Sequence, residues 1–63
     1  MKLFEFAIIH NPPKDADARP SMIVEITNIL ATDANQATLL AARQIPETFL
    51  DRLDEVELVV RPF

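Results

Sequence analysis

Hydrophobic and polar residues alternate with a period of two in three separate segments of the chain. These segments are residues 2–10, 21–28 and 55–61. In the first of them, Phe4 and Phe6 fall on one face of an extended strand. Aromatic and β-branched residues are frequent in all three segments, as is typical of β-strands. The pattern therefore predicts three strands, the first of which is ended by two successive prolines that cannot donate to a sheet.

A helix is predicted between the second and third strands. Asp33 can cap the free amides of its first turn, and Gln36, three residues later, completes a capping box. Thr32 is the competing cap residue. Because Pro46 disfavours helical backbone at the residue before it, we expect this helix to end near Gln44.

A second, short helix is expected directly after the first. Pro46 can open it, since the first position of a helix loses nothing when the amide donor is missing. Phe49, Leu50 and Leu53 lie at helical spacing, so the pattern predicts that they point inward.

The order strand–strand–helix–helix–strand predicts one α+β domain over residues 1–63. We expect a three-stranded, mainly antiparallel sheet with both helices on one face. The last strand can pair beside the first, which is then central, or beside the second through a right-handed crossover. We favour the first arrangement, because Phe4, Phe6 and Ile8 form the best set of core-facing side chains.

The two faces of this predicted sheet differ in polarity. The uniformly apolar face, which we expect to contact the helices, holds Phe4, Phe6, Ile8, Met22, Val24, Ile26, Val56, Leu58 and Val60. The opposite face is half apolar, which is typical of a surface that binds a partner. The alternative is a solvated face with cross-strand ion pairs, such as Glu5 or Glu25 with Arg61.

The half-apolar face and the terminal aromatic residue together make the predicted interface. Its residues are Leu3, Glu5, Ala7, Ile9, Ile23, Glu25, Glu57, Val59, Arg61 and Phe63. A chain of 63 residues buries only about 60% of its unfolded surface and is marginally stable alone. No disulfide can help, because the chain has no Cys. We therefore expect a homo-oligomer.

Composition and charge exclude several classes of function. Without Cys there is no thiolate zinc site, and without Gly there is no phosphate-binding glycine loop. The net charge of −4 argues against a nucleic-acid partner. No apolar run approaches the roughly 18 residues of a membrane span, and no signal-peptide pattern is seen, so we expect no membrane partner.

Two groups of residues are the candidates for chemistry. Glu5, Glu25 and Glu57 can converge only if the strand registers agree, and solvated carboxylates are far commoner than a site of this kind. His10 and Ser21 could belong to a Ser–His–acid arrangement, but no nucleophile-elbow sequence surrounds the serine. We interpret His10 as a strand-end histidine in water. The sequence therefore predicts neither an enzyme nor a metal or cofactor site.

Three segments resemble a group of very small proteins encoded by tailed bacteriophages. They are residues 1–7 (MKLFEFA), 39–47 (LLAARQIPE) and 56–63 (VELVVRPF). The resemblance implies a phage origin and a location in the host cytoplasm or in the virion. No activity or residue role is carried over from this group.

These observations together favour a small, non-enzymatic protein-interaction module. We expect it to self-associate, through the half-apolar face or an exposed edge strand, and to bind or modulate a host or defence protein. The alternative is an auxiliary virion protein that decorates or cements a capsid.

Overall fold

A computed structural model of the protein describes residues 1–15 and 17–63. Its elements in chain order are the strands β1 (Lys2–His10) and β2 (Ser21–Ala31), the helix α1 (Ala34–Ala42), the 3₁₀ helix η1 (Glu47–Glu55) and the strand β3 (Val56–Pro62). The predicted α+β class, with three strands and two helices, is confirmed. The connection between β1 and β2 contains Ala16, which lies outside the described residues, and residues 14–15 and 17–20 of this connection are exposed.

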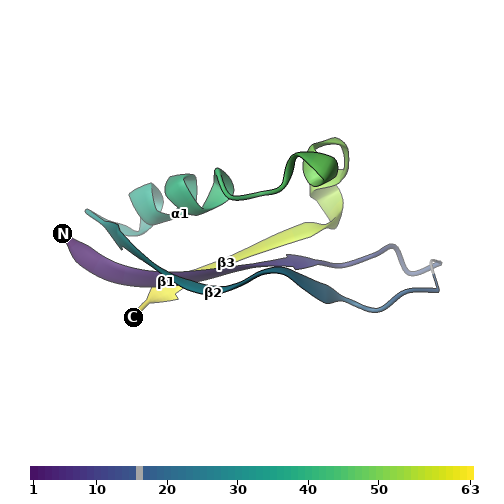
Figure 1. Cartoon of the computed structure of the whole chain (residues 1–63), viewed down its shortest axis with the longest axis horizontal. Helices are drawn as coiled ribbons and strands as arrows, with labels where there is room; N and C mark the ends of the chain where they lie inside the picture. Colours follow the sequence, from purple (N-terminus) through teal and green to yellow (C-terminus); the bar gives the residue numbers. More distant parts are fainter. Residues whose placement is uncertain (16) are drawn as a thin grey trace.

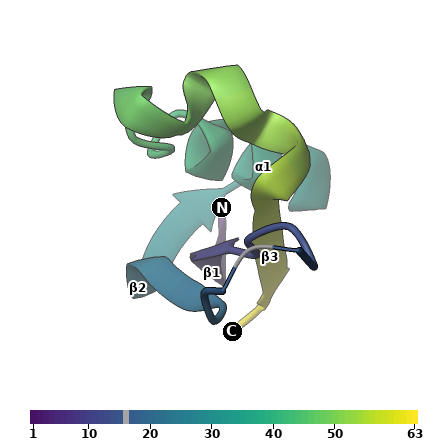
Figure 2. The same ribbon diagram turned by 90° about the vertical axis from the view of Figure 1, so that its right-hand side faces the viewer.

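The strands form one antiparallel sheet in the order β2-β1-β3. The arrangement with β1 in the centre is therefore confirmed, and the parallel crossover is wrong. Figure 1 shows α1 and η1 above the same face of the sheet, and Figure 2 shows the two layers from the end. Neither helix of the described chain is long and apolar enough to cross a bilayer.

The start of α1 follows the predicted capping signal. The Asp33 side chain accepts a hydrogen bond from the backbone N–H of Gln36 at 2.8 Å. The Gln36 side chain in turn accepts from the backbone N–H of Thr32 at 2.6 Å, one residue earlier than in a capping box. Arg43 is the C-cap, and the helix ends at Ala42, two residues before the predicted Gln44.

The core between helix and sheet is small. Phe4, Ala31 and Ala37 form one cluster of buried side chains, and Phe6, Ile8 and Ala41 form the other. Half of these side chains are alanines, which let α1 lie close to the sheet but bury little apolar area. The packing therefore depends mainly on two phenylalanines and one isoleucine of β1.

The pairing of β1 with β2 shifts twice along the strands. While β1 advances two residues, from Phe6 to Ile8, β2 advances three, from Thr27 to Val24. A second shift follows between Ile8 and Ile9. Each shift is a β-bulge that places an extra residue in β2. Because side chains alternate with a period of two, each extra residue reverses which face the following side chains occupy.

The register with β1 corrects the predicted faces of β2. Met22 and Ile26, expected in the core, are 51% and 58% exposed. Ile23, expected on the opposite face, packs against the cluster around Ile8, as does Val24. The pairs Phe4–Ile29 and Phe6–Thr27 already turn the odd-numbered residues of β2 toward the helices, opposite to the predicted phase. The two bulges together restore this phase, and between them they turn Val24 toward the core.

The second helix also differs from the prediction. Leu50 and Leu53, expected to point inward, are more than half exposed, and Phe49 is only half-buried. A 3₁₀ helix has three residues per turn, so Leu50 lies a third of a turn away from Phe49. The non-helical backbone of Arg52 (φ −142°, ψ 49°) then breaks the period before Leu53. The helical spacing seen in the sequence is therefore not realised as one apolar face.

Candidate interaction surface

The sheet face that points away from the helices is called the open face below. Its residues are Leu3, Glu5, Ala7 and Ile9 on β1, Met22, Ile26, Asn28 and Leu30 on β2, and Glu57, Val59 and Arg61 on β3. The register sets this membership, because directly paired residues of antiparallel strands project from the same face. Leu3 pairs with Leu30 at one end of the face, and Ile9 pairs with Met22 near the other.

A shallow hollow lies in the middle of the open face. It has a volume of about 180 Å³ and is lined by Glu5, Phe6, Ala7, Ile9, Met22, Ile26, Val59 and Arg61. Ligand pockets are usually larger, roughly 300–1,000 Å³. The hollow is therefore better suited to receive side chains of a protein partner than a small molecule.

Half of the predicted interface residues line this hollow. They are Glu5, Ala7, Ile9, Val59 and Arg61. Leu3 and Glu57 belong to the open face but lie outside the hollow, and Glu25 is exposed on the bulged stretch of β2. Ile23 lies on the helix side, as described above. The terminal Phe63 is exposed, and its backbone N–H donates to the Leu3 carbonyl at 3.1 Å, which keeps it alongside β1.

Sequence reasoning missed Met22, Ile26 and Leu30 as residues of the open face. The first two were assigned to the core by alternation, and Leu30 was taken as the approach to the helix. The one available signal is the uninterrupted apolar run from Met22 to Val24, which departs from strict alternation. Neither glycine nor proline marks the bulges, so turn chemistry does not reveal them.

One ion pair lies at the edge of the hollow. Glu5 and Arg61 are directly opposite each other in the β1–β3 register, and the Arg61 Nε donates to the Glu5 carboxylate. The cross-strand pair proposed for a solvated face is thus present. Glu57 instead pairs with Ile9, four residues along β1 from Glu5. Among residues 1–15 and 17–63, no three acidic or histidine side chains come together as a metal site would need.

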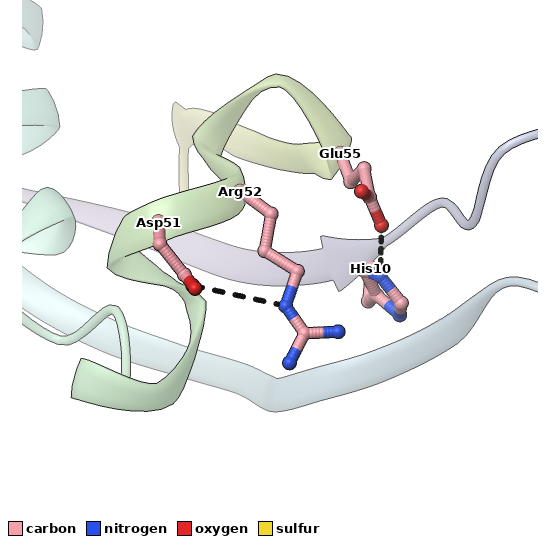
Figure 3. A network of polar contacts seen from close by, with 4 residues as sticks. All are labelled: His10, Asp51, Arg52 and Glu55. Atoms are coloured by element: carbon pink, nitrogen blue, oxygen red, sulfur yellow. Dashed lines mark hydrogen bonds and ion pairs between the residues drawn. The ribbon is translucent and has the colours of Figure 1, made fainter.

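His10 lies in a cluster, not in water, which corrects the prediction. Its Nε2 donates to Glu55 Oε1 at 2.9 Å, and the two side chains are only 17% and 21% exposed (Figure 3). The His10 ring also lies against Phe49, with the ring centroids 5.0 Å apart. The Asn11 N–H donates to the Glu55 carbonyl at 2.7 Å. The register causes this arrangement, because β3 begins directly beside the end of β1.

The remaining contacts of this cluster hold η1 in place. Arg52 lies over the Phe49 ring, with its Cζ 5.3 Å from the centroid, and its Nε is 3.8 Å from Asp51 (Figure 3). Ser21 is paired with His10 in the β1–β2 register. The contacts found between described side chains include none from the Ser21 hydroxyl to the imidazole, which a serine nucleophile requires. The contacts of this cluster therefore hold η1 against the end of β1.

Large exposed hydrophobic side chains gather on the open face. In the described part of the chain the most exposed ones are Met1, Leu3, Met22, Ile26, Leu30, Leu39, Leu50, Leu53, Val59 and Phe63. Half of these ten belong to the open face. Exposed apolar side chains that gather on one face are typical of interaction surfaces, so the open face is the candidate surface.

Comparisons with known proteins add no further evidence on function. No protein-family model, curated protein or solved structure matches the chain. Any function must therefore be argued from the open face itself.

Proposed function

We propose that this protein is a small, non-enzymatic protein-interaction module that associates through its open face. In this proposal it self-associates and also binds or modulates a host or defence protein. The observation that carries the proposal is the row of exposed apolar side chains along the whole open face, from Leu3 and Leu30 to Met22. Such a row has no structural use in an isolated chain.

The energetics of the fold support a role in binding. Each large apolar side chain that becomes fully buried contributes about 1.5–3 kcal/mol. The chain itself buries mostly small side chains against α1, while Met22 and Ile26 remain in solvent. A partner that covers the open face would therefore stabilise the fold and bind in the same step.

The resemblance of residues 1–7, 39–47 and 56–63 to small phage proteins supports the choice of partner. A phage-encoded module would act in the host cytoplasm or in the virion. Its acidic character favours a partner whose contact surface is neutral or basic.

The proposal is tested by affinity capture from phage-infected cells with the full chain as bait, followed by mass spectrometry. We expect one defined host protein to be retained by the unaltered chain and by Leu39→Glu, which changes an exposed leucine of α1. The variant Ile26→Glu, which changes the open face, should lose it. Retention by all three proteins, or by none, would contradict binding through the open face.

The same experiment separates the virion role. A protein that decorates a capsid would remain with washed particles at a fixed, high copy number. A regulator of a host protein would be absent from those particles.

A further inference from the structure

We propose that two copies of this chain pair through the outer edge of β3, in an antiparallel register centred on Val59. The contact joins the two three-stranded sheets into one continuous sheet. This inference rests on the self-association named in the proposed function, and it assigns that self-association to one edge of the sheet. The open face of each copy stays free for a different partner.

The two edge strands of the sheet, on opposite sides of β1 in Figure 2, differ in regularity. On one side, two bulges interrupt β2. On the other side, β3 pairs with β1 from Val56 to Pro62 without any shift of register. Bulges prevent other strands from pairing with an edge, whereas a regular edge strand is a template for an added strand. The edge of β3 is therefore the one suited to pairing.

Hydrogen bonds at both ends of the β1–β3 pairing show which backbone groups of β3 point outward. The Phe63 N–H donates to the Leu3 carbonyl at 3.1 Å. At the other end, the Asn11 N–H donates to the Glu55 carbonyl at 2.7 Å. Because hydrogen-bonded and non-hydrogen-bonded pairs alternate along an antiparallel ladder, the odd-numbered residues of β3 bond to β1. The N–H and C=O groups of its even-numbered residues therefore point away from β1.

Two of these outward N–H groups are available to a second strand. The Val56 N–H already donates to the Leu53 carbonyl of η1. Pro62 has no N–H to donate. Leu58 and Val60 therefore supply the outward donors of β3, and each also supplies an outward carbonyl acceptor.

The charges on β3 are complementary to those of a second β3. Glu57 and Arg61 belong to the open face and lie two residues before and two residues after Val59. In the register centred on Val59, Leu58 lies opposite Val60 of the second copy, so both available donors are used. Glu57 then lies opposite Arg61 of the second copy, in a non-hydrogen-bonded pair, where side chains approach most closely. The two-fold symmetry repeats this ion pair on the other side of the axis.

Neighbouring registers lack this match. A register centred on Glu57 or on Arg61 places two like charges directly opposite each other, which destabilises a strand pair. A register centred on Leu58 places Glu57 opposite Val59. A register centred on Val60 places Arg61 opposite Val59 instead. The charge complementarity therefore identifies a second copy of β3, in this one register, as the occupant of the edge.

Both charged side chains are available for contact between copies. Glu57 is exposed, and the ion pairs among residues 1–15 and 17–63 do not include it. The Arg61 side chain is 64% exposed, and its contact with Glu5 uses the Nε donor. A guanidinium has further N–H donors on its terminal nitrogens, which can reach Glu57 of the second copy. The pair between β1 and β3 within each copy is therefore kept in the dimer.

The pairing also determines how the faces of the two copies lie. Directly opposite residues of antiparallel strands project from the same face of a sheet. The helices of both copies therefore lie on one side of the joined sheet, and the two open faces lie side by side on the other.

The test is sedimentation equilibrium of the unaltered chain and of two charge-swapped variants, each alone and then mixed. Glu57→Arg has a cation at both positions of the ion pair. The double variant Glu5→Arg with Arg61→Glu has an acid at both positions and keeps a neutral pair within each copy. Each variant alone should dimerise at least about tenfold more weakly than the unaltered chain, because like charges then lie opposite each other twice. An equal mixture should associate to within about threefold of the unaltered chain, since each cation again faces an acid.

The backbone supplies a second, independent arm of the test. A synthetic chain with a methylated Val60 amide nitrogen keeps every side chain but loses an outward donor, so its dimer should be weaker by at least about tenfold. The control is Ile26→Glu, which adds a charge to the open face on β2 and should change the dimer by less than about twofold. Circular dichroism establishes that each chain is folded.

An unaltered chain that stays monomeric up to about 1 mM would overturn the inference, as would charge-swapped variants that fail to associate when mixed. An unchanged dimer in the methylated chain would also overturn it. A monomeric chain that still retains a host protein through the open face would leave that binding standing and remove the contact between copies. A dimer with no captured host protein would support this inference and contradict the host-binding part of the proposed function.

Discussion

At the scale of single residues, the fold depends on very few side chains. Ile8 is the only large side chain in the described residues that is fully buried. It contacts the second core cluster from the central strand, between Ala41 of α1 and the half-buried residues of both outer strands. Removing its side chain should therefore affect all layers of the fold.

We predict that Ile8→Ala lowers the free energy of unfolding by about 2–5 kcal/mol, because it removes buried methyl groups and leaves a cavity. A domain of this size has a total stability of only roughly 3–9 kcal/mol, so the variant should be close to unfolded. Urea denaturation followed by circular dichroism measures the change. Leu39→Ala is the matched control, since Leu39 is 68% exposed and its loss should cost less than about 0.5 kcal/mol.

The cap of α1 is a second residue whose role can be measured. Asp33→Ala removes the acceptor for the Gln36 N–H and should lower the free energy of unfolding by about 1 kcal/mol. Asp33→Asn keeps an acceptor at the same place and should retain most of the stability. Equal losses in the two variants in thermal unfolding would show that the cap hydrogen bond is not the cause.

At the scale of the elements, sequence patterns predicted which helices and strands exist, and their order, better than which way the side chains of each element point. The start of α1 at Asp33 and its end before Pro46 follow from local backbone chemistry, and both predictions are confirmed. Local backbone chemistry does not predict which face of the sheet each side chain of β2 occupies. Its phase depends on hydrogen bonds with β1, and both bulges arise in that pairing.

The register of β2 makes a prediction opposite to that of the sequence pattern. Ile23→Asp should destabilise the fold by at least about 2 kcal/mol, since it places a charge against the core cluster of Phe6 and Ile8. Ile26→Asp should change the stability of the monomer by less than about 1 kcal/mol, because Ile26 faces solvent. Chemical denaturation at low protein concentration compares the two variants. The reverse order of stability would show that the register between β1 and β2 is shifted in solution.

At the scale of the whole molecule, the proposed association would be linked to folding. A chain with a small core and an apolar open face gains stability when that face is covered. The His10–Glu55 contact joins the end of β1 to the end of η1. Both helices pack on one face of the sheet, and no helix of the described chain covers the open face.

We predict that the melting temperature rises with protein concentration. For a dimer, each tenfold increase adds about 0.7 kcal/mol per chain, which corresponds to roughly 3–6 °C for a domain of this size. Differential scanning calorimetry over a hundredfold range measures the slope. The variant Glu57→Arg should show a smaller slope, and a slope equal to that of the unaltered chain would contradict association through the edge of β3.

Local chemistry along the chain was sufficient to predict three strands, two helices and the cap at Asp33, whereas the sequence left two strand orders open and the structure decided between them. These features depend on the period of hydrophobic residues and on the backbone limits of proline and cap residues, which act within a few positions. Only the tertiary structure decided the faces of Met22, Ile23 and Ile26, and the burial of His10. Those depend on the register between strands that are far apart in the chain, and one extra residue in a strand is enough to exchange its two faces. The composition of the open face is therefore a property of the assembled sheet.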